Sequence, residues 1–401
     1  MADSLDLELE ALLALPLPRL EKLDIDGTSL IPAVLDEDTF SGEVPRALTN
    51  VDVYSCAILP TCPALRAPLT SLKLYDCPIW NSMEEALQTL SELPHLEEFL
   101  WIAIVSMDDD RIPFTPAPLS AYEGRTPQSV RLPRLSDLNL RVRVEIATYF
   151  FRYIVIPPSC GIIVDADLDS ITATDMDALL PALDDAFGER FRTLFPDNEP
   201  DAGFRRLDVD PFQDGSVEGV SMTWSQSTTR QISANFRLGF LPSHNDDENV
   251  DPVCLAIVCH ILENWPSAHR AVSELRNIHP RLFSVDTGST DPRRLAWARI
   301  LAGLRRLENV VLYDSIDGFP EAFVLKASTS CLSIRRVDVE GVDFTPTTLA
   351  RLMRSLKIYF SKLDLDTRSH PPTLHPSACR LSDVTLPDFS ATIDACLPSL
   401  S

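Results

Sequence analysis

This sequence is short of glycine and of basic residues. Only 13 of its 401 residues are glycine, well below the usual ~7%. Neither GxGxxG nor GxxxxGKS/T occurs, so glycine-rich loops that bind phosphate are not expected. Lys and Arg number 35 against 59 Asp and Glu, which gives a formal net charge of −24 at pH 7. Because nucleic acids and anionic membranes bind basic surfaces, this deficit argues against both as partners and favours basic or neutral protein surfaces.

Long apolar runs and paired cysteines are absent as well. The longest apolar stretches, such as Phe99–Val105, are far shorter than the ~20 residues that cross a bilayer. The N-terminus is acidic, whereas a secretory signal begins with basic residues. The nine cysteines form no CxxC and lie scattered along a chain much longer than a disulfide-stapled domain. We therefore expect reduced cysteines and a cytoplasmic or nuclear protein.

A recurring aliphatic pattern is the strongest signal in the sequence. Leu69–Cys77 reads LTSLKLYDC and matches LxxLxLxxC fully, and Leu48–Cys56 repeats it as LTNVDVYSC. Shorter versions begin at Leu20, Leu96, Leu135, Phe204, Leu307, Ile334, Phe360 and Leu381. The starting positions lie 28, 21 and 27 residues apart near the beginning of the chain and 27, 26 and 21 apart near its end. A period in the twenties is typical of leucine-rich repeats.

The spacing within each repeat predicts a short strand that is buried on one face. Aliphatic residues alternate with period two in LxL, and the cysteine that follows suits a small buried side chain where the chain leaves the strand. Helices are expected over Ser82–Leu93, which begins with a capping box, and over Thr345–Leu356, where Pro346 suits the first helical position. The sequence predicts an α/β fold, a leucine-rich-repeat solenoid with parallel strands on the concave face of a curved horseshoe and helices or irregular turns outside. Unrelated strands in an ordinary α/β domain are the alternative.

The repeats are less regular in the middle of the chain. We expect a single leucine-rich-repeat domain over residues 1–401, with irregular insertions at about 107–127 and 187–250. Short alternating segments within 187–250 indicate ordinary strands. Two lobes, 1–186 and 251–401, are the alternative organisation.

Alternate residues of the predicted strands point outward and form the candidate binding surface. Trp101 falls at an inward position and is assigned to the core. The candidate partner-binding residues on the outward face are Asp24, Asp52, Tyr54, Lys73, Tyr75, Arg141, Asp208, Tyr313, Asp338 and Asp364. Tyrosines and acids on a rigid scaffold suit a protein partner that brings Lys or Arg and some apolar surface. The alternative is that the acids only keep the surface soluble.

Three segments resemble metal sites but lack part of the required pattern. Asp165–Asp177 begins like a calcium loop, yet Ser170 replaces the turn glycine and Met176 replaces the last acidic ligand, so we expect a strand-exit loop. The two cysteines of Cys254–Trp265 are expected to pack in the core of a helix, and His370–Cys379 is expected to be a proline-rich turn. Neither HExxH nor GxSxG occurs. We expect no metal, no cofactor and no enzymatic activity.

Three segments share a common style of repeat: Arg66–Cys77, Leu132–Val142 and the proline-pair segment Tyr153–Leu168. In these segments, and in degenerate form over most of the chain, the sequence resembles the F-box and leucine-rich-repeat proteins of mushroom-forming fungi. The resemblance implies repeats that recognise a substrate and an F-box that docks the adaptor of a cullin ubiquitin ligase. The first repeat begins by Leu20, so we expect the likeness to cover the repeat region only, without an F-box.

Two other functions stay open. The same solenoid could work as a free-standing scaffold without a link to ubiquitin, since the adaptor-binding element is not evident. An enzyme with its site in the irregular middle region, residues 187–250, is the third hypothesis. We expect a monomer in each case.

Overall fold

A computed structural model provides the structure of the chain, and it describes most but not all residues. The described residues are 11–27, 34–103, 130–168, 171, 175–195, 203–214, 217–225, 236–241, 252–276, 301, 303–313, 316, 319–320, 334–362 and 373–381. The predicted insertion at 107–127 lies outside them. The chain divides into two compact units, Met1–Asp169 with Thr174–Phe187, and Ser170–Ala173 with Gly188–Ser401. Among the described helices, none combines the length and the apolar character needed to cross a membrane.

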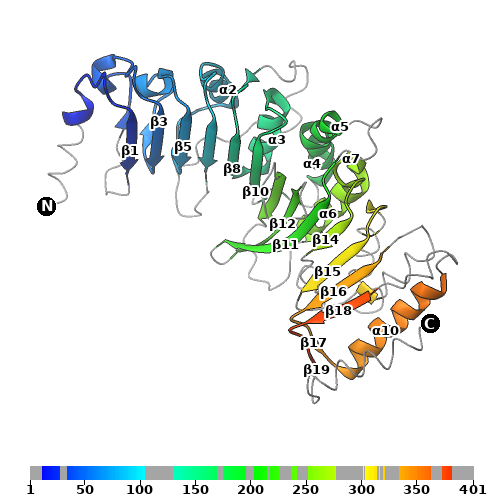
Figure 1. Ribbon diagram of the computed structural model, residues 1–401. Coiled ribbons are helices and arrows are strands. Elements are labelled where there is room, and N and C mark those ends of the chain that lie inside the picture. The colour runs from blue at the N-terminus through cyan, green and yellow to red at the C-terminus, as the bar shows by residue number, and fades with distance from the viewer. Residues whose placement is uncertain are drawn as a thin grey trace. The chain divides into compact units, whose positions relative to one another are not determined.

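The protein is of the mixed α/β class, and most of its strand pairs are parallel (Figure 1). The strands are β1 (Lys22–Asp26), β2 (Val34–Leu35), β3 (Asn50–Tyr54), β4 (Ala57–Ile58), β5 (Ser71–Tyr75), β6 (Glu98–Ile102), β7 (Val130–Arg131), β8 (Asp137–Arg143), β9 (Ile154–Val155), β10 (Gly161–Asp167), β11 (Arg206–Asp214), β12 (Val217–Ser225), β13 (Phe236–Leu241), β14 (Glu274–Arg276), β15 (Asn309–Tyr313), β16 (Arg336–Glu340), β17 (Asp343–Phe344), β18 (Thr373–Ser377) and β19 (Arg380–Leu381).

The helices follow or precede these strands along the chain. They are η1 (Thr39–Gly42), η2 (Pro63–Arg66), α2 (Met83–Ser91), α3 (Val144–Tyr153), α4 (Met176–Leu183), η4 (Asp184–Gly188), α5 (Glu189–Leu194), α6 (Pro252–Asn264), α7 (Pro266–His269) and α10 (Pro346–Lys362). In α2 the predicted cap is confirmed, because the Glu85 backbone N–H donates to Ser82 Oγ at 3.2 Å. α10 begins at Pro346, and Thr345 directly before it caps the helix, because Thr345 Oγ1 accepts a hydrogen bond from the Thr348 N–H at 3.1 Å.

The first unit contains a continuous parallel sheet in the order β1-β3-β5-β6-β8-β10. Figure 1 shows these strands side by side, with α2 and α3 next to each other at the top of the view. All five repeats predicted before residue 150 form strands of this sheet, and each pairs with the next in parallel. β10 adds a sixth strand beside β8. Parallel pairing at regular sequence steps is the arrangement that the period of the pattern predicts.

Alternation along each strand places the aliphatic pattern in the core. In β5 the burial alternates residue by residue, with Leu72 and Leu74 fully buried and their neighbours half-buried. The predicted cysteines are confirmed as small buried side chains at the strand exits. Cys56 Sγ lies 3.2 Å from the Tyr54 carbonyl oxygen, and Cys77 Sγ lies 3.2 Å from that of Tyr75. Burial raises the pKa of the Cys56 thiol to about 11 and that of Cys77 to about 12, so both remain protonated.

Gly27 marks a close approach between neighbouring repeats, and replacing it with alanine should destabilise the protein by about 1–2 kcal/mol. A Cβ atom there would lie 2.6 Å from the Ser55 carbonyl oxygen and 2.9 Å from Cys56 Sγ, closer than real contacts allow. The control is Gly161→Ala, whose Cβ would meet Asp137 Oδ1 at an ordinary 3.4 Å. Chemical denaturation of both variants measures the difference. Equal stability of the two variants would show that the backbone at Gly27 yields to the added methyl group.

The second unit contains strands in the order β13-β12-β11-β14-β15-β16-β18. β11 and β12 pair antiparallel, as do β12 and β13, so the irregular middle region contains ordinary strands as predicted. From β11 through β14, β15, β16 and β18 every pair is parallel. The repeats at Phe204, Leu307 and Ile334 form β11, β15 and β16.

Two expectations at the ends of this unit differ from the structure. The repeat predicted at Phe360 begins inside α10, which continues through Lys362 because helix-spaced residues such as Leu356 and Tyr359 extend its buried face past the expected end, and the rest of that repeat lies outside the described residues. The predicted turn His370–Cys379 contains the strand β18 in place of an irregular segment. Its Pro376 cannot donate a backbone hydrogen bond, and it is tolerated because β18 ends the strand order among the described residues. The repeat at Leu381 extends beyond the described residues.

β14 is a strand that the aliphatic pattern does not show. It reads Glu274-Leu275-Arg276, so it has a single aliphatic residue flanked by charges. Its backbone pairs in parallel with β11 on one side and β15 on the other. These pairings decide its conformation, since a three-residue strand has too little side-chain signal of its own.

Candidate functional site

The outward face of the first unit carries two rows of side chains in register. Strand pairing aligns Asp24 with Asp52 and Asp52 with Lys73, and then Leu100 and Asn139 continue the row. The second row consists of Asp26, Tyr54, Tyr75, Ile102 and Arg141. Alternate residues of the predicted strands are therefore aligned in two rows across β1, β3, β5, β6 and β8. Trp101 points inward and is 1% exposed, as predicted.

Tyr54 and Tyr75 form a tyrosine pair on this face. Their ring centroids lie 5.8 Å apart with an interplanar angle of 31°, and Tyr54 is 41% exposed, which is high for an aromatic residue. Burial raises the pKa of the Tyr75 hydroxyl, and the negative charge of Asp52 raises it further, so the hydroxyl stays neutral and can donate a hydrogen bond. The pair offers two adjacent aromatic surfaces and hydroxyl groups to a ligand.

Lys73 is in register with Asp52 on one neighbouring strand and forms an ion pair with Glu98 on the other. Its Nζ is 2.8 Å from Glu98 Oε1, and Ser71 Oγ donates to Glu98 Oε2 at 2.9 Å. The hydrogen bond to Glu98 raises the pKa of Lys73. Burial opposes ionisation of Glu98, but the hydrogen bonds from Lys73 and Ser71 outweigh it and lower the pKa of Glu98. Glu98 is in register with Ser71, two positions before the row that contains Lys73 and Leu100. It is not among the predicted site residues, and the ion pair with Lys73 becomes visible only when β5 and β6 are aligned.

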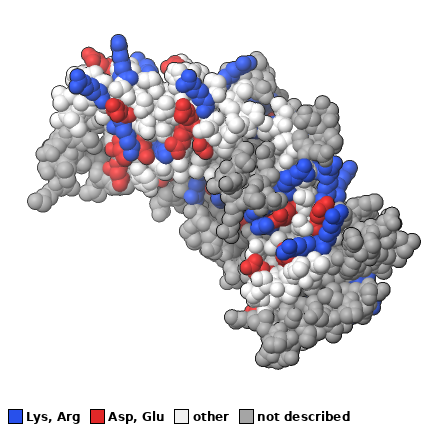
Figure 2. All heavy atoms as spheres, viewed as in Figure 1, with Lys and Arg blue, Asp and Glu red and all other residues white. Residues whose placement is uncertain are grey.

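Acidic and basic groups are mixed on this face, which we call the first-unit face. It consists of Lys22, Asp24, Asp52, Tyr54, Lys73, Tyr75, Glu98, Leu100 and Ile102. Lys22 Nζ also contacts Asp24 Oδ2 at 2.7 Å, in an exposed ion pair that contributes little stability. Figure 2 shows blue and red side chains interleaved with white atoms over the first unit. The face can bind a surface of mixed charge and apolar character.

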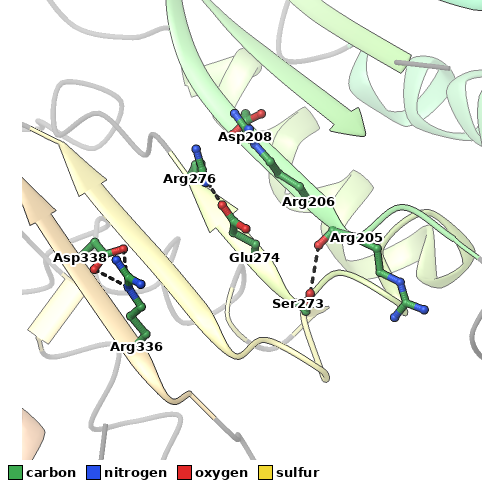
Figure 3. A network of polar contacts seen from close by, with 8 residues as sticks. All are labelled: Arg205, Arg206, Asp208, Ser273, Glu274, Arg276, Arg336 and Asp338. Atoms are coloured by element: carbon green, nitrogen blue, oxygen red, sulfur yellow. Dashed lines mark hydrogen bonds and ion pairs between the residues drawn. The ribbon is translucent and has the colours of Figure 1, made fainter. Parts of the chain in front are cut away.

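The second unit has a different polar arrangement, a charge ladder of Arg206, Asp208, Glu274, Arg276, Arg336 and Asp338 (Figure 3). Arg206 Nε donates to Asp208 Oδ1 at 2.8 Å. Arg336 Nε donates to Asp338 Oδ1 at 2.8 Å and to Oδ2 at 2.9 Å. On the strand between them Arg276 Nε donates to Glu274 Oε1. Each strand of the ladder thus joins an acid and an arginine two positions apart.

The order of charges reverses between neighbouring strands. Strand register places Arg206 beside Glu274 and Asp208 beside Arg276, so opposite charges face each other across β11 and β14 as well as along them. The spacing Arg-x-Asp in FRRLDV and IRRVDV is the sequence signal for two of the pairs. Asp208 and Asp338 are predicted outward residues, but Arg206 and Arg336 were not among the candidates, and the Glu-x-Arg order of β14 belongs to a strand that the pattern does not show.

The predicted exposure of Asp208 is wrong. Asp208 is 7% exposed and is held by Arg206, so it is not a carboxylate available to a basic partner. Burial raises the pKa of Asp208, and the hydrogen bond and charge of Arg206 oppose that shift only in part. Val311, which is in register with Asp338 on the neighbouring strand, is also buried. Asp338 is only half-buried, but its carboxylate is bound by Arg336.

The remaining candidate residues are placed by their strands. Tyr313 is in register with Glu340, and burial together with the charge of Glu340 raises the pKa of Tyr313. Arg141 is half-buried and in register with Ile102 and Asp165. Asp364 lies outside the described residues. The structure therefore brings Asp52, Tyr54, Lys73 and Tyr75 together, and it places Tyr313 and Asp338 on adjacent strands of the second unit.

The segments that resemble metal sites have other roles in the structure. Asp165 and Asp167 lie within β10 and not in a strand-exit loop, so that expectation is wrong. Cys254 and Cys259 are buried in α6, which confirms the predicted packing. Within the part of the chain that the structure describes, no three His, Cys, Asp or Glu side chains gather closely enough to hold a metal ion.

Comparison with known proteins adds no assignment. No protein-family model and no curated protein matches the chain. The strand register and the polar faces of the two units are therefore the basis for a functional assignment.

Proposed function

We propose that this protein is a non-catalytic leucine-rich-repeat solenoid that binds a protein partner on the first-unit face. The observation that carries the proposal is the tyrosine pair, two partly exposed rings 5.8 Å apart, which lie in register with each other on the same two strands as the register pair Asp52 and Lys73. Buried aliphatic residues hold these strands rigidly from the other side. A rigid aromatic pair with charges around it is typical of binding hot spots.

The partner's surface should be basic or mixed in charge, with apolar groups. Four carboxylates belong to the face or border it, namely Asp24, Asp26, Asp52 and Glu98, against two lysines. A guanidinium group over Tyr54 or Tyr75 would gain a cation–π contact and the attraction of Asp52. Leu100 and Ile102 extend the face with apolar area on β6. These features favour an arginine-bearing, partly apolar protein surface and disfavour a polyanion.

The resemblance to F-box and leucine-rich-repeat proteins suggests the role of a substrate-recognition region of a ubiquitin ligase. In that role the partner on the first-unit face is the substrate, and a cullin adaptor binds elsewhere through an F-box. The alternative is a free-standing scaffold that uses the same face without a ubiquitin link. Co-purification of a cullin adaptor with the full chain separates the two, since only the ligase role predicts it.

A cytoplasmic or nuclear location and a monomeric state belong to the same proposal. All seven cysteines that the structure describes are free and buried, which suits a reducing compartment. Their side chains pack in the core and close no covalent loops.

Replacing both tyrosines of the pair with alanine should reduce partner binding at least tenfold, which corresponds to ~1.4 kcal/mol or more. Truncation removes the aromatic surface and leaves the strands intact, because both side chains point away from the core. The measurement is quantitative affinity purification with mass spectrometry on Tyr54→Ala/Tyr75→Ala, followed by titration of the recovered partner.

The matched control is Leu12→Ala/Leu59→Ala, which removes two exposed apolar side chains that lie outside the parallel strands. The control should retain the partner at the level of the unmodified protein. If the tyrosine variant also retains it, the first-unit face is not the binding surface.

A further inference from the structure

The charged groups of the first-unit face are paired with one another except for one carboxylate. Lys22 Nζ lies 2.7 Å from Asp24 Oδ2, and Lys73 Nζ lies 2.8 Å from Glu98 Oε1. Within the part of the chain that the structure describes, the Asp52 carboxylate accepts no hydrogen bond and forms no ion pair. Asp52 therefore carries the one negative charge of this face that no group of the chain binds.

This carboxylate lies beside the tyrosine pair. Asp52 and Tyr54 occupy alternate positions of β3, so both point to the same side of the sheet, about 7 Å apart along the strand. Tyr75 is in register with Tyr54 on β5. Burial raises the pKa of Tyr75, and the charge of Asp52 raises it further, so the carboxylate is close enough to act on the second tyrosine as well. An unpaired acid and two aromatic rings thus share one small area.

A cation gains more at Asp52 than at the other acids of the face. Asp24 is exposed and already binds Lys22, so a further cation competes there with both water and the lysine. Asp52 is half-buried, which removes part of its water without supplying a donor from the chain. Lys73, its neighbour in register, is held by Glu98. A positively charged group with hydrogen-bond donors therefore supplies what the protein itself leaves out.

We infer that Asp52 anchors a single arginine side chain of the protein partner, with the guanidinium plane stacked on Tyr54. The inference rests on the proposed function and names the residue that gives the first-unit face its specificity. A guanidinium group donates two parallel hydrogen bonds to a carboxylate, and its flat face stacks on an aromatic ring. The ammonium group of lysine is a compact point charge and has no such plane. The site therefore prefers arginine to lysine, and it takes one cation because the other acids of the face have partners.

Nuclear magnetic resonance of the full chain with ring-labelled tyrosine tests the inference, because seven tyrosines give few signals. Tyr54→Phe and Tyr75→Phe assign the two signals of interest. The probes are two peptides of about seven residues, leucine and glycine with either one arginine or one lysine at the centre, titrated at physiological ionic strength. The arginine peptide should shift both ring signals and bind about fivefold more tightly than the lysine peptide.

Asp52→Asn should raise the dissociation constant of the arginine peptide about fivefold and remove its advantage over the lysine peptide. Asparagine has nearly the same size, and an unfolding midpoint within a few degrees of the unmodified protein will show that the variant folds. The matched control is Asp137→Asn, the same change of charge on β8, three strands from β3 and about 14 Å away. Asp137 is exposed and accepts a hydrogen bond from Ser136 Oγ at 2.9 Å, and its loss should change the constant less than about twofold.

Three results would overturn the inference: equal affinity for the two peptides, an unchanged constant in Asp52→Asn, and tyrosine signals that do not shift. The partner recovered by affinity purification separates this inference from the proposed function. If Tyr54→Ala/Tyr75→Ala loses that partner and Asp52→Asn retains it fully, the face binds without an arginine anchor and only the inference fails. If the tyrosine variant retains the partner, the proposed function itself fails.

Discussion

Replacing Phe99 with alanine should lower the free energy of unfolding by about 3–5 kcal/mol, the largest effect that we expect from a single substitution. Phe99 lies in β6, is fully buried and stacks on Phe150 of α3 with ring centroids 5.9 Å apart. It therefore joins the parallel sheet to the helix that covers it. Alanine would leave a cavity that neither the strand nor the helix can close without losing its other contacts. Chemical denaturation followed by circular dichroism measures the loss.

The neighbouring residue provides the control. Leu100 is next in the same strand but points outward and is half-buried, so Leu100→Ala should cost no more than about 1 kcal/mol. Both substitutions remove a large apolar side chain, and they differ mainly in the face of the strand from which it is removed. Similar losses for the two variants would contradict the strand register on which the first-unit face depends.

The second large effect should come from breaking the charge ladder. Arg206→Met should destabilise the protein by about 2–4 kcal/mol at pH 7, because it leaves the carboxylate of Asp208 in a buried position without its hydrogen-bond donor. Methionine keeps much of the length of the side chain, so the loss of packing is small. The double variant Arg206→Met/Asp208→Leu should lie within about 1 kcal/mol of the unmodified protein, since it removes both charges together.

The pH dependence of this effect has a defined sign. Burial already holds the pKa of Asp208 above its ordinary value of 3.8, so the folded state binds more protons than the unfolded state between the two pKa values. The stability that this group contributes is therefore greatest below the unfolded pKa and is lost as the pH rises through the folded pKa. Removing Arg206 raises the folded pKa further, so Arg206→Met should regain stability on acidification through a wider range than the unmodified protein. Denaturation curves at a series of pH values measure this dependence. If Arg206→Met is as stable at pH 7 as Arg206→Met/Asp208→Leu, Arg206 does not stabilise the buried carboxylate of Asp208.

Much of the first-unit sheet was predictable because its signal is local. In LTNVDVYSC and LTSLKLYDC the aliphatic residues alternate, and the cysteine marks the strand exit. The same nine residues therefore determine which side chains face the core and where the chain turns. Once consecutive repeats pair in parallel at equal offsets, Tyr54 must lie beside Tyr75. The tyrosine pair follows from the pattern for this reason.

The errors in the second unit have a different origin. The first residues of the repeat predicted at Phe360 also fit the last turn of an amphipathic helix, and α10 continues to Lys362 because its buried face extends to Tyr359. β14 and β18 have few aliphatic residues and are strands because a neighbouring strand pairs with their backbone. Hydrogen bonds between residues far apart in the chain have no counterpart in local spacing.

The amino-acid sequence by itself determined the α/β class, the buried face of each regular repeat and the alignment of the tyrosines, since these depend on a period that a few residues contain. Only the tertiary structure decided which charges are exposed. Asp52 and Asp208 occupy the same place in their repeats, yet the first is half-buried near a lysine and the second is buried and bound to arginine. The reason is that the free energy of a charge depends on its distance from water and from opposite charges, and both are set by strands and side chains distant in sequence.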